Sequence, residues 1–100
     1  MPSHISLKRL YNTYNRKYFD NRLPQDTQIM WAPMDSAHGK CWQEEHIIHL
    51  DPPLQANVRF ARIILLHEMC HLACPESHHG KDFHREIARL FAAGAYKGLL

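Results

Sequence analysis

The first regular pattern of hydrophobic positions spans residues 6–20. Leucine and tyrosine recur there at the spacing of one helix face, at Leu7, Leu10, Tyr11, Tyr14 and Tyr18. Ser6 is suited to the N-cap position, because its hydroxyl can accept from a free N–H of the first turn. The helix should end before Leu23-Pro24, since the residue before a proline avoids the α region. We therefore predict an amphipathic helix whose tyrosines pack on a core.

Three short segments after this helix have the pattern of β-strands. Residues 27–32 are mainly apolar and end at Pro33. Residues 39–43 and 46–51 follow a turn-rich stretch, and Pro52-Pro53 ends the second of them.

The last two segments are predicted to form a hairpin, because only Glu44 and Glu45 separate them, although that dipeptide is a poor tight turn. The second segment alternates. Ile48 and Leu50 face one way, and Ile47 and His49 face the other.

Two further helices are predicted in the second half of the chain. Residues 55–73 begin polar and are nearly all apolar in their second half, as in a buried helix. This helix should end by Cys74-Pro75, and a loop follows at 75–80. A last helix over 81–93 has an apolar face made of Phe83, Ile87, Leu90 and Phe91. The order of elements predicts an α+β fold with a small three-stranded sheet.

The composition fits a single domain over residues 1–100. A chain of 100 residues leaves room for one domain, and 45% hydrophobic residues are enough for a core. The charged fraction of 22% is ordinary for a folded protein. The longest apolar run, 90–96, is far short of the roughly 18 residues of a membrane span, so no membrane association is expected.

The cysteines and the N-terminus indicate the compartment. Three cysteines are an odd number without the pattern of a disulfide framework, and the first residues lack the apolar core of a signal peptide. We therefore expect a cytoplasmic protein, or a nuclear one in a eukaryote. Cys41 is interpreted as an inward strand residue. Cys70 and Cys74 are interpreted as small buried residues, and a soft metal site is the alternative.

The net charge is +2 with neutral histidines, which is compatible with a nucleic-acid partner but does not require one. The basic side chains near the first helix are Lys8, Arg9, Arg16, Lys17 and Arg22. A solvated helix face is the default interpretation of such charges, and phosphate contact is the alternative. The oligomeric state is not determined by any of these features.

The chemistry of the chain is concentrated in the sequence LLHEMCHLA at residues 65–73. His67 and His71 are four residues apart, so they lie about 40° apart around a helix and can meet at one metal ion. Glu68 lies about 100° from His67, too far to be a third ligand but close enough to reach a water beside the metal. H-E-x-x-H thus predicts two zinc ligands and a general base.

A chance match must be weighed, since the chain has nine histidines. However, two histidines and a glutamate in an apolar, buried helix are costly unless each has a partner. A shared zinc ion is the simplest such partner.

A catalytic zinc ion needs a third protein ligand and one open position. The metzincin pattern is excluded, because Ser77 occupies the place of its third histidine. Either a later glutamate, as in gluzincins, or a histidine of HHGKDFH could complete the set, and Gly80 permits a sharp turn there. The remaining alternatives are His78, His79, His84 and Glu86.

These motifs resemble the SprT-like zinc metalloprotease family, whose mark is H-E-x-x-H, a short loop, and H-G-x-x-F. HEMCH and HGKDF match that mark, YNTYNRKYFDNRLP resembles the family's first helix, and IMWAP, GKCW and IIHLDPPL resemble its strands. The resemblance spans roughly residues 7–92 and concerns the protease core alone. The loop between His71 and His79 is short, and three cysteines cannot form the zinc ribbon that many members carry.

The resemblance implies a zincin-like fold that binds one zinc ion through His67, His71 and His79. Glu68 is then the general base, Gly80 the bend, and His78 a bystander. Phe83 is expected to pack the last helix against the core.

By this resemblance, the expected function is a zinc-dependent endopeptidase acting on protein or peptide substrates, with DNA-associated proteins as one substrate class. Zinc polarises the peptide carbonyl and acidifies the attacking water, and Glu68 takes the proton. The substrate is expected to pair with an exposed strand edge, for which residues 39–43 are the prediction. The alternative is a zinc-containing module that binds or recruits nucleic acid with little turnover.

Four more residues have weaker functional interpretations. His49, His84 and Tyr96 are candidates for a second electrophile, although each is more simply a packing or surface residue. Asp82 either accepts a hydrogen bond from a ligand histidine or favours the first turn of the last helix.

Overall fold

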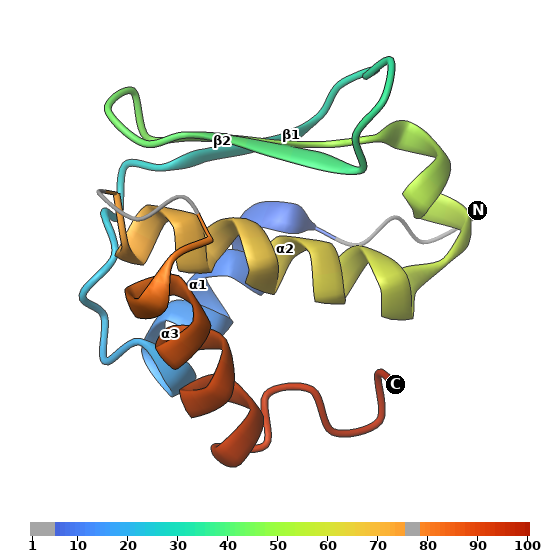
Figure 1. The fold of residues 1–100 in the computed structure, drawn as a ribbon. Coiled ribbons are helices and arrows are strands. Elements are labelled where there is room, and N and C mark those ends of the chain that lie inside the picture. The colour runs from blue at the N-terminus through green and yellow to red at the C-terminus, as the bar shows by residue number, and fades with distance from the viewer. Residues whose placement is uncertain (1–5, 76–78) are drawn as a thin grey trace.

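The computed structural model describes residues 6–75 and 79–100 (Figure 1). The elements in chain order are α1 (Leu7–Tyr18), β1 (Gln28–Trp31), β2 (Gly39–Trp42), β3 (Ile47–Leu50), the 3₁₀ helix η1 (Pro52–Ala56), α2 (Val58–Ala73) and α3 (Lys81–Ala92). The predicted α+β order is confirmed. No helix in the described part of the chain is long and apolar enough to cross a bilayer.

Helix α1 begins as predicted. The Ser6 hydroxyl accepts from the Arg9 N–H at 3.4 Å, and the side chains of Leu7, Tyr11 and Tyr14 are buried in the core. The Tyr11 hydroxyl donates to the Pro24 carbonyl oxygen at 2.7 Å, so its polar end is satisfied. The tyrosines are therefore core residues, as their spacing predicts.

The helix ends at Tyr18, and the return of the chain depends on a buried polar residue. Asn15 both donates to the Leu23 carbonyl and accepts from the Leu23 N–H, each at 3.1 Å. Asp20 and Asn21, which lie between Asn15 and Leu23 in the chain, have positive φ angles of 55° and 57°. Such residues tolerate this conformation better than most, which makes the reversal compatible with the sequence.

The sheet has the strand order β1-β3-β2, with β1 parallel and β2 antiparallel to β3. The β2–β3 hairpin is confirmed, but its loop comprises the four residues 43–46, and His46 has a φ of 57°. The longer loop removes the need for a two-residue turn at Glu44-Glu45. Strand β2 lies at an edge of the sheet, as expected for 39–43.

Helix α2 packs on the inner face of this sheet. Ile48 and Leu50 are completely buried there, which confirms the predicted alternation of β3. In Figure 1 the sheet lies on one side of α2 and α3 on the other. The helix begins at Val58 rather than at 55, because η1 spans Pro52–Ala56 and the Asn57 side chain caps α2 by accepting from the Phe60 N–H. It ends at Ala73, as predicted.

The predicted apolar face of α3 is correct at Phe83 and Leu90 and wrong at Phe91. Phe83 and Leu90 are buried, whereas Phe91 is 58% exposed and its ring stacks on Tyr96. The last turn of α3 therefore has one side in the core, at Leu90, and Phe91 lies on its exposed side.

Candidate functional site

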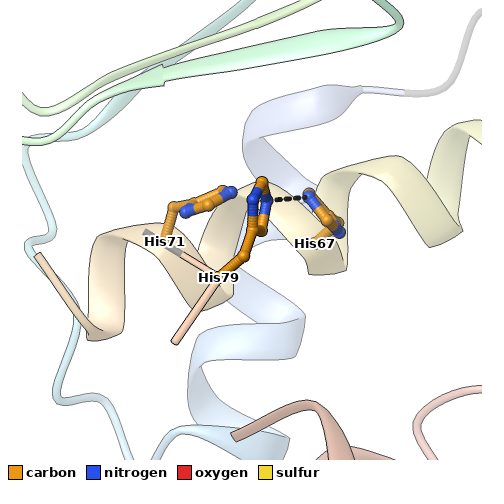
Figure 2. Close-up of side chains that lie close together, drawn as sticks. All are labelled: His67, His71 and His79. Carbon is orange, nitrogen blue, oxygen red and sulfur yellow. Dashed lines mark hydrogen bonds between the residues drawn. The ribbon is translucent and has the colours of Figure 1, made fainter. Parts of the chain in front are cut away.

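Three histidines converge beside α2. His67 and His71 lie one turn apart on α2, and His79 precedes the first turn of α3. Figure 2 shows the ring of His79 between the other two rings. His79 Nε2 is 3.4 Å from His67 Nε2. One nitrogen from each of the three imidazoles lies within 4.8 Å of the others.

This donor set fits a zinc ion. Zinc–nitrogen bonds of about 2.0–2.1 Å in a tetrahedral site place the nitrogens about 3.3 Å apart. The His67–His79 separation of 3.4 Å already matches this spacing. Three imidazoles that approach from one side leave a fourth position open. Among the described residues, these are the three that could hold a metal ion together.

The backbone of His79 makes the sharp bend that was predicted for Gly80. His79 has a φ of 52°, in the left-handed region, while Gly80 is extended with φ −85° and ψ −162°. A non-glycine residue in this region costs on the order of 1 kcal/mol and persists where its surroundings dictate it. The bend is therefore found one residue before the predicted position. The residue with the unusual conformation is His79 and not Gly80. His78, the expected bystander, lies outside the described residues.

Phe83 packs behind the three histidines. Its side chain is buried, and its ring centroid lies 5.0, 4.5 and 4.9 Å from those of His67, His71 and His79. The expected packing of the last helix against the core through Phe83 is confirmed. One ring from the first turn of α3 therefore contacts all three imidazoles.

Glu68 lies in the same place but does not join the nitrogen cluster. Its side chain is 6% exposed and, together with the three histidines, lines a pocket of about 290 Å³. Burial raises the pKa of the Glu68 carboxyl from 4.5 to about 7. Burial also lowers the pKa of His67, with the nearby His79 as a second cause. Both shifts favour neutral side chains in the absence of a bound cation.

Strand β2 forms the opposite wall of this pocket through Gly39, Lys40 and Cys41. A Cβ atom on Gly39 would lie 2.7 Å from Ile64 Cγ2 and 3.2 Å from a Glu68 carboxylate oxygen. Glycine therefore permits the close approach of β2 to α2. A glycine at the start of a strand could have signalled such an approach, although the sequence interpretation did not use it.

The hairpin loop also contacts the site. Gln43 lines the pocket, and its Nε2 donates to the His71 carbonyl oxygen at 3.0 Å. This bond joins the loop to the C-terminal turn of α2. Nothing in the sequence distinguishes Gln43 from an ordinary turn residue, because the partner lies far along the chain.

The other proposed third ligands have different surroundings. Glu86 accepts two bonds from Arg89, at 2.7 and 3.1 Å, and lies 3.6 Å from Arg22. His84 is exposed on α3. Neither residue belongs to the nitrogen cluster, so His79 is the downstream residue that the described structure brings to His67 and His71.

The candidates for a second electrophile lie away from the pocket. His49 is on the outer face of the sheet against the Trp42 ring, with centroids 4.6 Å apart. Tyr96 is buried after α3, where burial raises its pKa. Asp82 lies exposed in the first turn of α3 and pairs with Arg85 at 3.8 Å. This agrees with the interpretation of Asp82 as an acidic residue that favours the first turn of the helix.

Two of the cysteines are buried or half-buried, and two of the basic residues donate to backbone carbonyls. Cys70 is completely buried, and Cys41 lies half-buried in the pocket wall, where burial raises its pKa to about 12. Lys8 Nζ donates to two backbone carbonyls, those of Gln25 and Thr27, at 2.7 and 2.6 Å. Arg22 donates to the Phe19 carbonyl, so neither cation is simply part of a solvated face.

A helix carrying this histidine pair beneath a small mixed sheet, with a further helix behind it, is the fold of zincin-like metallopeptidases. The chain belongs to the SprT-like family, whose model matches residues 7–97.

Two crystal structures of metallopeptidase zymogens share this fold. Abylysin from Pyrococcus abyssi superposes with a TM-score of 0.71 at 21% identity, covering 94% of this chain and 88% of that one. Jannalysin from Methanocaldococcus jannaschii gives a TM-score of 0.69 at 18% identity, covering 95% and 90%. No match was found among curated protein sequences.

Proposed function

We propose that this chain is a zinc-dependent peptidase that hydrolyses peptide bonds in protein substrates. The observation that carries the proposal is the presence, in one pocket, of three converging imidazoles and a buried carboxyl group from the next position of α2. Membership of the SprT-like family and the fold shared with two metallopeptidase zymogens support the same function.

His67, His71 and His79 are the proposed zinc ligands. These three side chains would hold the zinc ion, which would supply Lewis-acid chemistry for a peptide carbonyl and a water molecule. The ring of Phe83 holds the three imidazoles in place from the side of α3. Gln43 anchors the carbonyl of His71, which restrains the C-terminal turn of α2.

Glu68 is the proposed general base and acid. Its carboxylate accepts the proton of the attacking water and then donates it to the amine as the peptide bond breaks. Efficient proton transfer in both directions favours a pKa near the working pH. Burial raises the pKa of Glu68 to about 7, and a cation bound nearby would lower it from there.

Strand β2 is the proposed binding edge for the substrate. It pairs with β3 on one side and forms the edge of the sheet on the other, while Gly39, Lys40 and Cys41 line the pocket. An extended segment that adds to this edge places its backbone along the pocket, where main-chain hydrogen bonds give affinity with little sequence preference. The proposed substrates are therefore flexible or unfolded protein segments.

The test compares Glu68→Gln with Glu45→Gln, which removes an exposed carboxylate from the hairpin loop. We expect both variants to retain about one zinc ion per chain by elemental analysis. Cleavage of an unfolded protein should fall by at least about a hundredfold in Glu68→Gln, because general acid–base catalysis contributes on that scale. Glu45→Gln should cleave as the wild type does. Full activity of zinc-loaded Glu68→Gln would contradict the proposed role.

A further inference from the structure

Arg62 carries a buried nitrogen that has no hydrogen-bond acceptor in the described residues. The side chain is half-buried, and its Nε atom is inaccessible to solvent and unpaired. It lies close to α1, since its positive charge partly offsets the burial that raises the pKa of Tyr14. A buried guanidinium N–H without an acceptor is unfavourable. Among the described residues, Arg62 Nε is the buried side-chain nitrogen left without an acceptor, so any partner must come from the immediate surroundings of this side chain.

A pocket of about 270 Å³ lies beside Arg62, between α1 and α2. Its remaining wall is the N-terminal part of α1, through Ser6, Arg9, Leu10 and Thr13. These residues follow helical spacing, so they form one continuous face. Among the described lining residues, this pocket has none in common with the histidine pocket. It is a separate site on the molecule.

The pocket offers positive charge and hydrogen-bond donors. Its walls carry two guanidinium groups and two hydroxyls, and no carboxylate lines it in the described chain. The ion pairs formed within residues 6–75 and 79–100 involve neither Arg9 nor Arg62. The free N–H groups of the first turn of α1 add to the positive potential. An anion in this pocket would therefore meet two cationic walls and no carboxylate of the described chain.

Other arginines of the chain show the contrast. Arg22 and Arg89 both contact Glu86, and Arg85 contacts Asp82. Arg59, one turn before Arg62 at the start of α2, is exposed to water, which can solvate it. Among the arginines of the chain, Arg62 is thus the one that is half-buried and without a carboxylate partner in the described part of the chain.

We propose that this pocket binds a phosphate group, as inorganic phosphate or the terminal phosphate of a small ester. Arginine presents its donors as a planar fork that matches phosphate oxygens. A tetrahedral dianion can accept from Arg9 and Thr13 on α1 and from Arg62 on α2 at the same time, and it balances both cations. A carboxylate has only one negative charge and two oxygens, so it would balance one of the two cations and offer fewer acceptors than phosphate does. The volume is below the roughly 300–1,000 Å³ of pockets for drug-sized ligands, which also favours a small group.

The test follows the Nε–Hε resonance of Arg62 by NMR in zinc-loaded protein, assigned by its loss in Arg62→Lys. Inorganic phosphate is added at constant ionic strength, with acetate as the carboxylate comparison. We expect a saturable shift of the Arg62 resonance, with affinity for phosphate at least tenfold above that for acetate. This readout reports on the pocket itself, so phosphate that binds at the zinc site does not produce it.

Two variants of exposed residues complete the design, because neither endangers the fold. Arg9→Ala removes one wall of the pocket and should weaken phosphate binding at Arg62 about tenfold or more. Arg59→Ala removes a charge from the same helix outside the pocket and should change binding less than twofold. If both variants lost the same amount of phosphate affinity, binding would depend on the overall charge of the protein and not on this pocket, which would overturn the proposal.

The remaining outcomes also decide between ligands. An Arg62 resonance that does not respond to phosphate overturns the proposal, as does an equal response to acetate. A single-stranded oligonucleotide without terminal phosphates is the last probe. If it shifts the Arg62 resonance at lower phosphate-group concentration than inorganic phosphate does, the pocket binds a polynucleotide backbone, and the proposed small ligand is wrong.

Discussion

Gly39 of β2 lies against Glu68 of α2 so closely that a Cβ atom would stand 3.2 Å from the Glu68 carboxylate oxygen. The same atom would be 2.7 Å from Ile64 Cγ2, a separation that side chains do not tolerate. The spacing between the sheet and α2 therefore depends on the absence of a side chain at position 39. This relationship links the edge strand to the proposed general base.

Gly39→Ala should force β2 and α2 apart. Overpacking of this kind costs about 1–3 kcal/mol, which urea unfolding can measure. If Glu68 is the general base, kcat should fall more than KM rises, because the carboxyl group is displaced from the attacking water. Lys40→Ala, at the exposed neighbouring position, should change stability by less than about 0.5 kcal/mol. Wild-type stability and kcat in Gly39→Ala would show that the contact does not constrain the site.

Phe83→Ala should weaken both the fold and zinc binding. Removal of a buried phenylalanine costs about 3–5 kcal/mol, and here it also removes the ring that contacts all three histidines. Phe83→Leu, which retains most of the buried volume, separates the two effects. We expect it to fold and to release zinc to a chelator faster than the wild type does.

The matched control for Phe83 is Phe91, the exposed phenylalanine of the same helix. Phe91→Ala should alter the free energy of unfolding by less than about 1 kcal/mol and leave zinc release unchanged. If Phe83→Leu releases zinc at the wild-type rate, the aromatic contacts do not fix the histidines.

Local patterns predicted most of the elements. Ser6 caps α1, β3 alternates as its residues indicate, and the helical spacing of His67 and His71 places them together. These features depend on neighbours within a few residues, which is the range over which periodicity and capping act.

The remaining features depend on contacts between distant segments. Alternation assigns the faces of β3 but not its neighbours, so the parallel pairing with β1 was not predicted. The bond from Gln43 to His71 and the positive φ of His79 are equally determined by tertiary packing. Phe91 was assigned to the core because a helical stripe shows which side is apolar but not where the packing partner ends.

Stability should fall at alkaline pH because buried acidic groups keep their protons in the folded protein. Burial raises the pKa of Cys41 from 9.0 to about 12, and it raises the pKa of Cys70 and Tyr96 in the same direction. Each group ionises first in the unfolded chain. Its contribution is therefore complete below its unfolded pKa and is lost as pH rises from about 9 toward the folded pKa.

Urea unfolding at pH 8 and pH 10 measures this loss. Cys70→Ala removes one of the titrating groups and should make the decrease between the two pH values smaller, whatever its effect at pH 8. Cys74→Ala, which removes a more exposed thiol, should reduce the pH dependence less. An identical decrease in Cys70→Ala and the wild type would mean that this thiol does not contribute.

His79→Ala should lower zinc affinity by orders of magnitude, since it removes one of three proposed ligands. The matched control is His84→Ala, which deletes an exposed histidine of α3 and should bind zinc as the wild type does. Competition with a chromophoric chelator measures both affinities, and circular dichroism without metal shows whether the fold is retained. The backbone conformation reinforces the expectation. Position 79 has an unfavourable positive φ of 52°, and alanine forms no metal bond that would stabilise it. Zinc affinity that is unchanged in His79→Ala but lost in His84→Ala would assign the third ligand to α3 and displace His79 from the proposed site.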